Sequence, residues 1–117
     1  MRDTIKRHDD FIMTETDLSA RCGAFIIRAR ATRFPGDARY GLVATKKTFR
    51  HAVDRNRAKR VLRVWIRGNE SWLDDGRDYV FIARPSILAW QHTDGMVAMK
   101  KALRYLRKQK IDGVPQQ

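Results

Sequence analysis

The segment that most constrains this chain is VDRNRAKRVLRVWIR, residues 53–67, which is too charged for a core strand and too apolar for a disordered tail. At about 100° per residue, a helix places its two kinds of side chain on opposite faces. The apolar face gathers Ala58, Val61, Leu62 and Trp65. The basic arc opposite gathers Arg55, Asn56, Lys59, Arg60, Arg63 and Arg67. Arg57 lies off this arc, so we expect it to flank the core or to reach a different part of a partner.

The positive charge of the chain is concentrated around this helix. Lys and Arg number 25 against 13 Asp and Glu, which gives a net charge of +12. Between residues 46 and 67 the basic residues are Lys46, Lys47, Arg50, Arg55, Arg57, Lys59, Arg60, Arg63 and Arg67. Like charges four residues apart on a helix repel one another, and a merely solvated helix would intersperse acids among them. The segment therefore predicts a polyanionic partner, with nucleic acid as the first candidate.

RNA is favoured over DNA as this partner. A helix-turn-helix needs a second helix after a short turn, whereas Gly68 is followed by a turn and a strand. Guanidinium groups bind phosphate oxygens in bidentate geometry, and Asn56 adds a donor and an acceptor for a sugar hydroxyl or a base edge. We therefore expect RNA binding and no DNA partner.

The first half of the chain predicts one short helix and two strands. A helix is expected within residues 8–18, with an aspartate as its N-cap. The β-rich segment 23–31 alternates toward its end, which places Arg28 and Arg30 on a shared basic face. A Pro-Gly-Asp turn then leads to a strand over residues 40–45, and the simplest pairing of these two strands is an antiparallel hairpin.

The second half predicts two helices around a strand. The basic helix is expected over residues 50–67, with Thr48 as a cap and Gly68 as its C-terminal stop. The apolar run 79–84 is typical of an interior strand, and Thr93 is expected to cap the last helix. The apolar stripe of that helix is Met96, Met99, Leu103 and Leu106. Together these elements predict an α+β sandwich of two layers.

Chain length and residue types narrow the class of protein further. We expect a single domain over residues 1–117 with a frayed tail at 111–117. No apolar run is long enough to span a bilayer, and the N-terminal residues lack the apolar stretch of a signal peptide. The sequence thus predicts a cytoplasmic protein without a membrane partner. Cys22 is the one cysteine, which excludes an internal disulfide.

Residue types that support catalysis are present but are not grouped. Ser, His and Asp occur without the spacing of a catalytic triad, and His8, His51 and His92 are isolated from one another. Two Asp-Asp pairs are explained by a helix cap and a turn. Trp72 and Trp90 remain open between packing and contact with a partner. We therefore predict no catalytic residue and no metal site on this chain.

One stretch, YGLVATKKTFRHAVDRNRAKRVLR, resembles the core signature of the bacterial ribonuclease P protein family. The matching residues are Lys46-Lys47, Ala52-Val53, Arg55-Asn56-Arg57 and Lys59-Arg60. At lower stringency the similarity extends from residue 6 to about residue 108. The resemblance implies the element order αβββαβα, with one more short strand within residues 18–21. It also implies a mainly antiparallel sheet with a left-handed strand–helix–strand crossover, as in the second domain of one ribosomal protein of the small subunit.

The same resemblance implies a function. Family members bind the catalytic RNA subunit of ribonuclease P and the 5′ leader of precursor tRNA, and the RNA removes the leader with the help of magnesium. Together with the basic arc, the residues expected to bind the RNA subunit are Lys46, Lys47, Arg50, Arg55, Asn56, Arg57, Lys59, Arg60, Arg63 and Arg67. The residues expected to bind the leader are Phe11, Arg28 and Arg30. The catalytic centre of this endoribonuclease is thus expected on the RNA.

Three positions depart from the family pattern. Glu15 stands where a second aromatic residue is usual one turn after Phe11. Arg28 replaces an aromatic residue late in the first long strand, and Phe49 replaces the glycine after the lysine pair. The leader is therefore expected to be held here by the charge of Arg28 and Arg30 rather than by stacking.

Two other functions are compatible with the residue pattern. A ribosomal or general RNA-binding protein of similar fold would show the same basic helix but no preference for a substrate with a 5′ leader. A protein-only, metal-dependent nuclease would need grouped acids near the basic residues, and the sequence has few there. Activity without added RNA would distinguish this second alternative.

Overall fold

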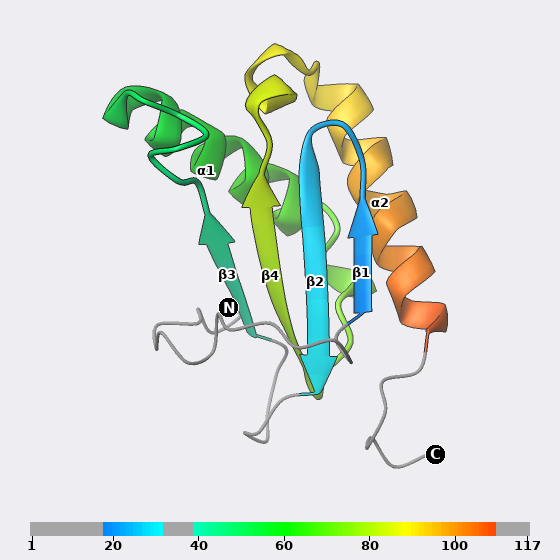
Figure 1. The fold of residues 1–117 in the computed structure, drawn as a ribbon. Coiled ribbons are helices and arrows are strands. Elements are labelled where there is room, and N and C mark those ends of the chain that lie inside the picture. Colours follow the sequence, from blue (N-terminus) through cyan, green and yellow to red (C-terminus); the bar gives the residue numbers. More distant parts are fainter. Residues whose placement is uncertain (1–17, 32–38, 110–117) are drawn as a thin grey trace.

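The computed structural model describes residues 18–31 and 39–109, which form a four-stranded sheet with two helices on one of its faces (Figure 1). The elements are β1 (Leu18–Arg21), β2 (Phe25–Ala31), β3 (Arg39–Val43), α1 (Ala52–Arg67), η2 (Glu70–Trp72), β4 (Arg77–Ala83), η3 (Pro85–Ala89) and α2 (His92–Lys108). The two-layer α+β architecture is confirmed, and β1 is the additional short strand. The predicted N-terminal helix, the Pro-Gly-Asp turn and the frayed tail lie outside the described residues.

The strands are not ordered in the sheet as they are along the chain. Their spatial order is β1-β2-β4-β3; β2 pairs antiparallel with both β1 and β4, and β3 pairs parallel with β4. The predicted hairpin of strands 23–31 and 40–45 is therefore wrong, because β4 lies between them. The sequence of β4, RDYVFIA, is buried along most of its length. Such a strand takes a central position because both of its edges and both of its faces can then be covered.

Helix α1 connects the two parallel strands by a crossover of unusual hand. In Figure 1, β3 and β4 both point upward with β4 to the right of β3, and α1 passes behind the sheet. This path is left-handed, whereas nearly all such connections are right-handed. The hand that the family resemblance implied is confirmed. Hydrophobic periodicity carries no information about it.

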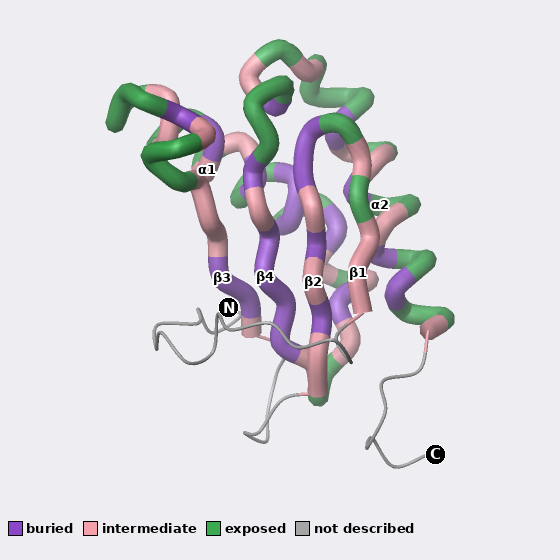
Figure 2. The backbone as a smooth tube through the Cα atoms, in the orientation of Figure 1, coloured by how far each residue is buried: buried purple, intermediate pink, exposed green. Residues whose placement is uncertain are grey.

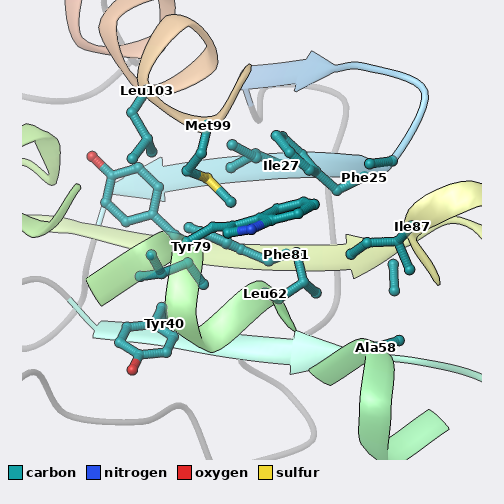
Figure 3. Packing of buried hydrophobic residues seen from close by; sticks show 14 of the residues in the cluster. Phe25, Ile27, Tyr40, Ala58, Leu62, Tyr79, Phe81, Ile87, Met99 and Leu103 are labelled. Carbon is teal, nitrogen blue, oxygen red and sulfur yellow. The ribbon is translucent and has the colours of Figure 1, made fainter. Parts of the chain in front are cut away.

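The hydrophobic core lies between the sheet and the two helices (Figures 2 and 3). The large side chains at its centre are Phe25, Ile27, Leu62, Trp65, Tyr79, Phe81, Met99 and Leu103. Each of them stabilises the fold by roughly 1.5–3 kcal/mol through burial. Alternate residues of β2 leave the core, so Arg28 and Arg30 share the opposite face of the sheet, as predicted.

Two glycines set the close approach of α1 and α2. A Cβ atom on Gly95 would lie 2.0 Å from the ring of Trp65, and a Cβ atom on Gly68 would lie 2.2 Å from the Met96 side chain. Helix α1 does end before Gly68, but the φ angle of this residue is −69°. Gly68 therefore lies close to the end of the Met96 side chain of α2, and its backbone does not adopt the left-handed conformation of a C-terminal glycine turn.

Both predicted threonine caps are wrong. His51 is the N-cap of α1 and Gln91 is the N-cap of α2, and neither makes a side-chain capping hydrogen bond. Thr48 belongs to a turn before α1, where its backbone N–H donates to the hydroxyl of Thr45 at 3.2 Å. Thr93 lies inside the first turn of α2. Apolar packing, rather than capping chemistry, decides where these helices begin.

Candidate nucleic-acid interface

The inner face of α1 is fixed against the sheet. Ala58, Leu62, Trp65 and Ile66 are buried, and the Trp65 ring lies 6.2 Å from the ring of Phe25, centroid to centroid, in an edge-on contact. The first three of these belong to the predicted apolar face. Ile66 widens that face toward the basic arc. The helix therefore cannot rotate about its axis without exposing large aromatic and aliphatic side chains.

The outer face of α1 presents cations and one amide to solvent. Its exposed polar residues are Asn56, Arg57, Arg60, Arg63 and Arg67. Arg57, expected off the main arc, is exposed along with the others. Lys59 and Arg55, also on the predicted basic arc, are half-buried rather than exposed. Within residues 18–31 and 39–109, no ion pair joins any of these α1 cations to an acid.

Arg55 has a local structural contact that sequence reasoning missed. Its guanidinium Nη1 donates to the backbone carbonyl of Phe49 at 2.9 Å and to that of Arg50 at 3.2 Å. Phe49, the residue that departs from the family pattern, is buried. These contacts hold the segment before α1 against the helix, so Lys46, Lys47 and Arg50 are exposed close to its N-terminal end.

The second predicted site lies on the other face of the sheet. Arg28 is opposite Ser19 in β1 and opposite Val80 in β4, and Arg30 is opposite Asp78 in β4. The two helices cover the far side of these strands (Figure 1). The α1 residues expected to bind the RNA subunit and the two arginines expected to bind the leader therefore lie on different faces of the protein. The third residue predicted to bind the leader, Phe11, lies outside the described residues.

A buried acid modifies the charge of this sheet face. Asp78 is 3% exposed and accepts two hydrogen bonds from the Arg39 guanidinium, at 3.1 Å and 2.7 Å. Because Arg30 also lies beside Asp78, part of the local positive charge is neutralised at this end of the face. Arg28 has neutral cross-strand neighbours instead. The apolar run of β4 does not indicate that the one acid of this strand lies beside two arginines.

A third cationic cluster, on α2, was not predicted. Lys100, Arg104 and Arg107 lie over the ring of Trp72, with their cationic groups 5.9, 5.4 and 5.6 Å from its centroid. Arg107 also pairs with Asp74 at 3.0 Å. Trp72 is thus a packing residue that fastens α2 to η2, and these three cations are engaged in the fold.

The side chains that support catalysis are scattered over the part of the chain that the structure describes. Among them no group of three or more His, Cys, Asp or Glu side chains is placed to hold a metal ion. His51 and His92 are exposed at the starts of different helices. Asp74, which lies in the segment before β4, forms ion pairs with Arg77 and Arg107. Burial raises the pKa of Tyr79, whose hydroxyl accepts a hydrogen bond from the Asp74 backbone N–H. None of these groups forms a catalytic constellation.

The part of the chain that the structure describes contains no helix with the length and apolar character of a membrane span.

Comparison with known proteins identifies the family. The family model described as Ribonuclease P matches residues 2–107. The ribonuclease P protein component of a Marinomonas species is 34% identical over 86% of this chain and 74% of its own length. That of Ruegeria pomeroyi is 34% identical over 91% of this chain and 87% of its own length.

Solved structures agree with the fold. The ribonuclease P protein of Staphylococcus aureus superposes with a TM-score of 0.73 over 91% of this chain and 96% of its own, at 21% identity. That of Thermotoga maritima gives 0.72 over 89% and 97%, at 22% identity. The sequence match, the sheet order and the left-handed crossover lead to one conclusion: this chain belongs to the bacterial ribonuclease P protein family.

Proposed function

We propose that this chain docks the catalytic RNA of its ribonuclease P on the outer face of α1 and on the segment that precedes it. The observation that carries the proposal is the one-sided burial of α1. Its apolar residues are locked in the core, while Arg57, Arg60 and Arg63 are exposed on the other side. A helix held in this way presents guanidinium groups to a row of phosphates without reorganisation on binding.

Phosphate contacts supply most of the proposed affinity. Every phosphate that a Lys or Arg neutralises releases condensed counterions, so binding weakens as the salt concentration rises. Lys46, Lys47 and Arg50 extend the cationic surface beyond the N-terminal end of α1. Asn56 is exposed among these cations, and its amide fits a sugar hydroxyl or a base edge.

The 5′ leader of precursor tRNA is proposed to lie on the sheet face opposite the helices. Arg28 is expected to contribute more than Arg30, because Arg30 shares its neighbourhood with the carboxylate of Asp78. Phe11 remains a proposed leader contact from the family resemblance. This arrangement puts the RNA subunit and the precursor on separate faces, so one small protein can bind both.

Cleavage of the leader is proposed to take place on the RNA subunit, which would also hold the magnesium ions. Among the described residues, no three or more His, Cys, Asp or Glu side chains are grouped to hold such an ion. The chain instead supplies positive charge between two polyanions, which lowers their mutual repulsion and hence the concentration of magnesium that their complex needs. We place this activity in the cytoplasm, where tRNA precursors mature.

Reconstitution tests the proposal directly. The protein is mixed with a bacterial ribonuclease P RNA, and cleavage of a precursor tRNA is followed at low magnesium. We expect the protein to restore cleavage, Arg63→Glu to weaken binding of the RNA subunit by about tenfold or more, and Arg84→Glu to leave it within about twofold. Arg84 is an exposed arginine outside the proposed surfaces, so it controls for net charge.

The same assay separates the alternatives. No gain over the RNA alone would contradict a role in ribonuclease P. Equal binding of substrates with and without a leader would support a general RNA-binding protein. Cleavage by the protein without RNA would support a protein-only nuclease.

A further inference from the structure

A groove runs between the edge strand β1 and helix α2, away from the outer face of α1. Its volume is about 440 Å³, which is within the usual range for sites that hold small organic groups. The described residues that line it are Ser19, Ala20, Arg21, Cys22, Ala98, Lys101, Ala102 and Tyr105. We call it the β1–α2 groove. None of the surfaces described above includes its α2 residues.

The residues of the groove combine an exposed ring with cations. Tyr105 is 53% exposed, which is unusual for a large aromatic side chain, and it lies one helical turn after Lys101. Arg21 and Lys101 are exposed on the two sides of the groove, on β1 and α2. The small side chains of Ala98 and Ala102 leave space between Arg21 and Lys101. The described lining has no Asp or Glu, so the charge of the groove favours an anion.

The two sides of helix α2 have different surroundings. Lys100, Arg104 and Arg107 are engaged with Trp72 on one side of the helix. Lys101 and Tyr105 belong to the stripe that faces β1. Leu103 and Leu106 of the same helix are buried in the core, whereas Tyr105 lies outside it with its ring exposed to solvent.

The groove also continues the sheet face that carries Arg28. Residues opposite each other in antiparallel strands share a face, so Ser19 lies beside Arg28 and Arg21 lies beside Ile26. Ser19 and Arg21 are groove residues as well. A flexible strand lying over Arg28 can therefore pass over the edge of β1 into the groove.

We propose that the β1–α2 groove binds an unpaired segment of RNA, with a base stacked on Tyr105 and the adjoining phosphates held by Arg21 and Lys101. An aromatic platform beside cations is the general chemistry of single-strand recognition, and duplex RNA cannot offer an unstacked base to it. The site is separate from the outer face of α1, so it goes beyond the docking function proposed above. Its RNA segment can come from the precursor leader or from the RNA subunit.

The first experiment measures binding of a fluorescent oligouridylate to the full chain. Tyr105→Ala is expected to weaken binding by about tenfold and Tyr105→Phe to preserve it, since stacking needs the ring and not the hydroxyl. The double variant Arg21→Gln with Lys101→Gln should lower the slope of log K against log salt by about 1.4, because each contact with a single strand contributes about 0.7. Arg84→Gln is the charge control, and thermal unfolding confirms that each variant is folded.

The second experiment identifies the source of the RNA. Cys22 lines the groove and is the one cysteine of the chain, so a thiol-directed photocrosslinker can be attached there without adding a new residue. Crosslinks are mapped in the complex with the RNA subunit, with and without precursor tRNA. Crosslinks in the leader assign the groove to the substrate, and crosslinks in the RNA subunit that need no precursor assign it to the holoenzyme.

The proposal has outcomes that overturn it. It is overturned if folded Tyr105→Ala binds oligouridylate with unchanged affinity. Equal binding of single-stranded and duplex RNA would also overturn it. A polypeptide paired with the edge of β1 would then be the occupant to examine. Failure here is distinguishable from failure of α1 docking, because Arg63→Glu would still weaken binding of the RNA subunit while the Tyr105 and Lys101 variants would not.

Discussion

Helices α1 and α2 are both amphipathic and basic and lie on the same side of the sheet, yet their cations have different neighbours. On α1, Arg57, Arg60 and Arg63 are exposed, and no described acid pairs with them. On α2, Arg104 and Arg107 lie over Trp72 and take part in holding the helix in place. The number of cations on a helix therefore does not identify a binding site. What their charged groups already contact does.

The largest effect is expected from the two faces of α1. Leu62→Asp would bury an unpaired carboxylate where Leu62 is fully buried, so we expect a loss of about 4 kcal/mol or more in the free energy of unfolding. Arg63→Glu, at the next residue, should change stability by less than about 0.5 kcal/mol while it weakens RNA binding. Circular dichroism during thermal unfolding measures both. Equal loss of folding in the two variants would refute the separation of the faces.

The contact between the two helices gives the next effect. Gly95→Ala would place a Cβ atom 2.0 Å from the Trp65 ring, so one helix must move. We expect a cost of about 1–3 kcal/mol from overpacking, reduced in part by the better helix propensity of alanine. Urea unfolding measures it. Thr93→Ala, at an exposed position of α2, is the matched control, and an equal response of the two variants would mean that the helices do not touch closely.

A pH dependence follows from the α2 side of the core. Burial raises the pKa of Tyr79 above its usual 10.0, so the folded protein holds this proton more tightly than the unfolded chain. The resulting stability is complete below about pH 10 and falls by up to about 1.4 kcal/mol per pH unit as the pH rises toward the folded-state pKa. Unfolding midpoints at about pH 9 and about pH 11 measure this loss. Tyr79→Phe should show a smaller difference between them; an unchanged difference would assign the loss to other groups.

The smallest expected effect comes from exchanging one arginine on each helix, which compares the roles of the α1 and α2 cations directly. Arg104→Gln removes one cation over Trp72 and should cost about 0.5–1 kcal/mol of stability, with RNA affinity within about twofold. Arg63→Gln should do the reverse, leaving stability unchanged and lowering affinity. Thermal unfolding and a salt titration of RNA binding measure the pair. If both variants lost affinity equally, the two helices would belong to one RNA-binding surface.

Sequence patterns predicted the parts of the fold that are locally determined. The basic helix was placed to within two residues at its start and ended at Arg67, because its apolar spacing is set by contacts with the sheet. Strand pairing was not local: the Pro-Gly-Asp turn suggested a hairpin, whereas β4, distant in sequence, lies between β2 and β3. The apolar run of β4 did indicate an interior strand, but not which strands it would separate.

The candidate site was predictable to the extent that charge and periodicity define it. The exposure of Arg60 and Arg63 follows from the helical wheel. The carbonyl contacts of Arg55 and the pairing of Asp78 with Arg39 depend on segments brought together by the fold, so no sequence spacing indicates them. The helix was correctly predicted to end before Gly68, but this glycine does not adopt the left-handed conformation on which the prediction was based.

The central position of β4 also determines the order in which the chain can fold. Strands β2 and β3 leave the ribosome first, but neither has its long-range partner until the residues of β4 follow. Closing these distant pairs costs loop entropy before any pairing energy is gained, which slows folding relative to a protein built from hairpins. A nascent chain that ends before residue 77 thus has a basic helix but no completed sheet on which to pack it.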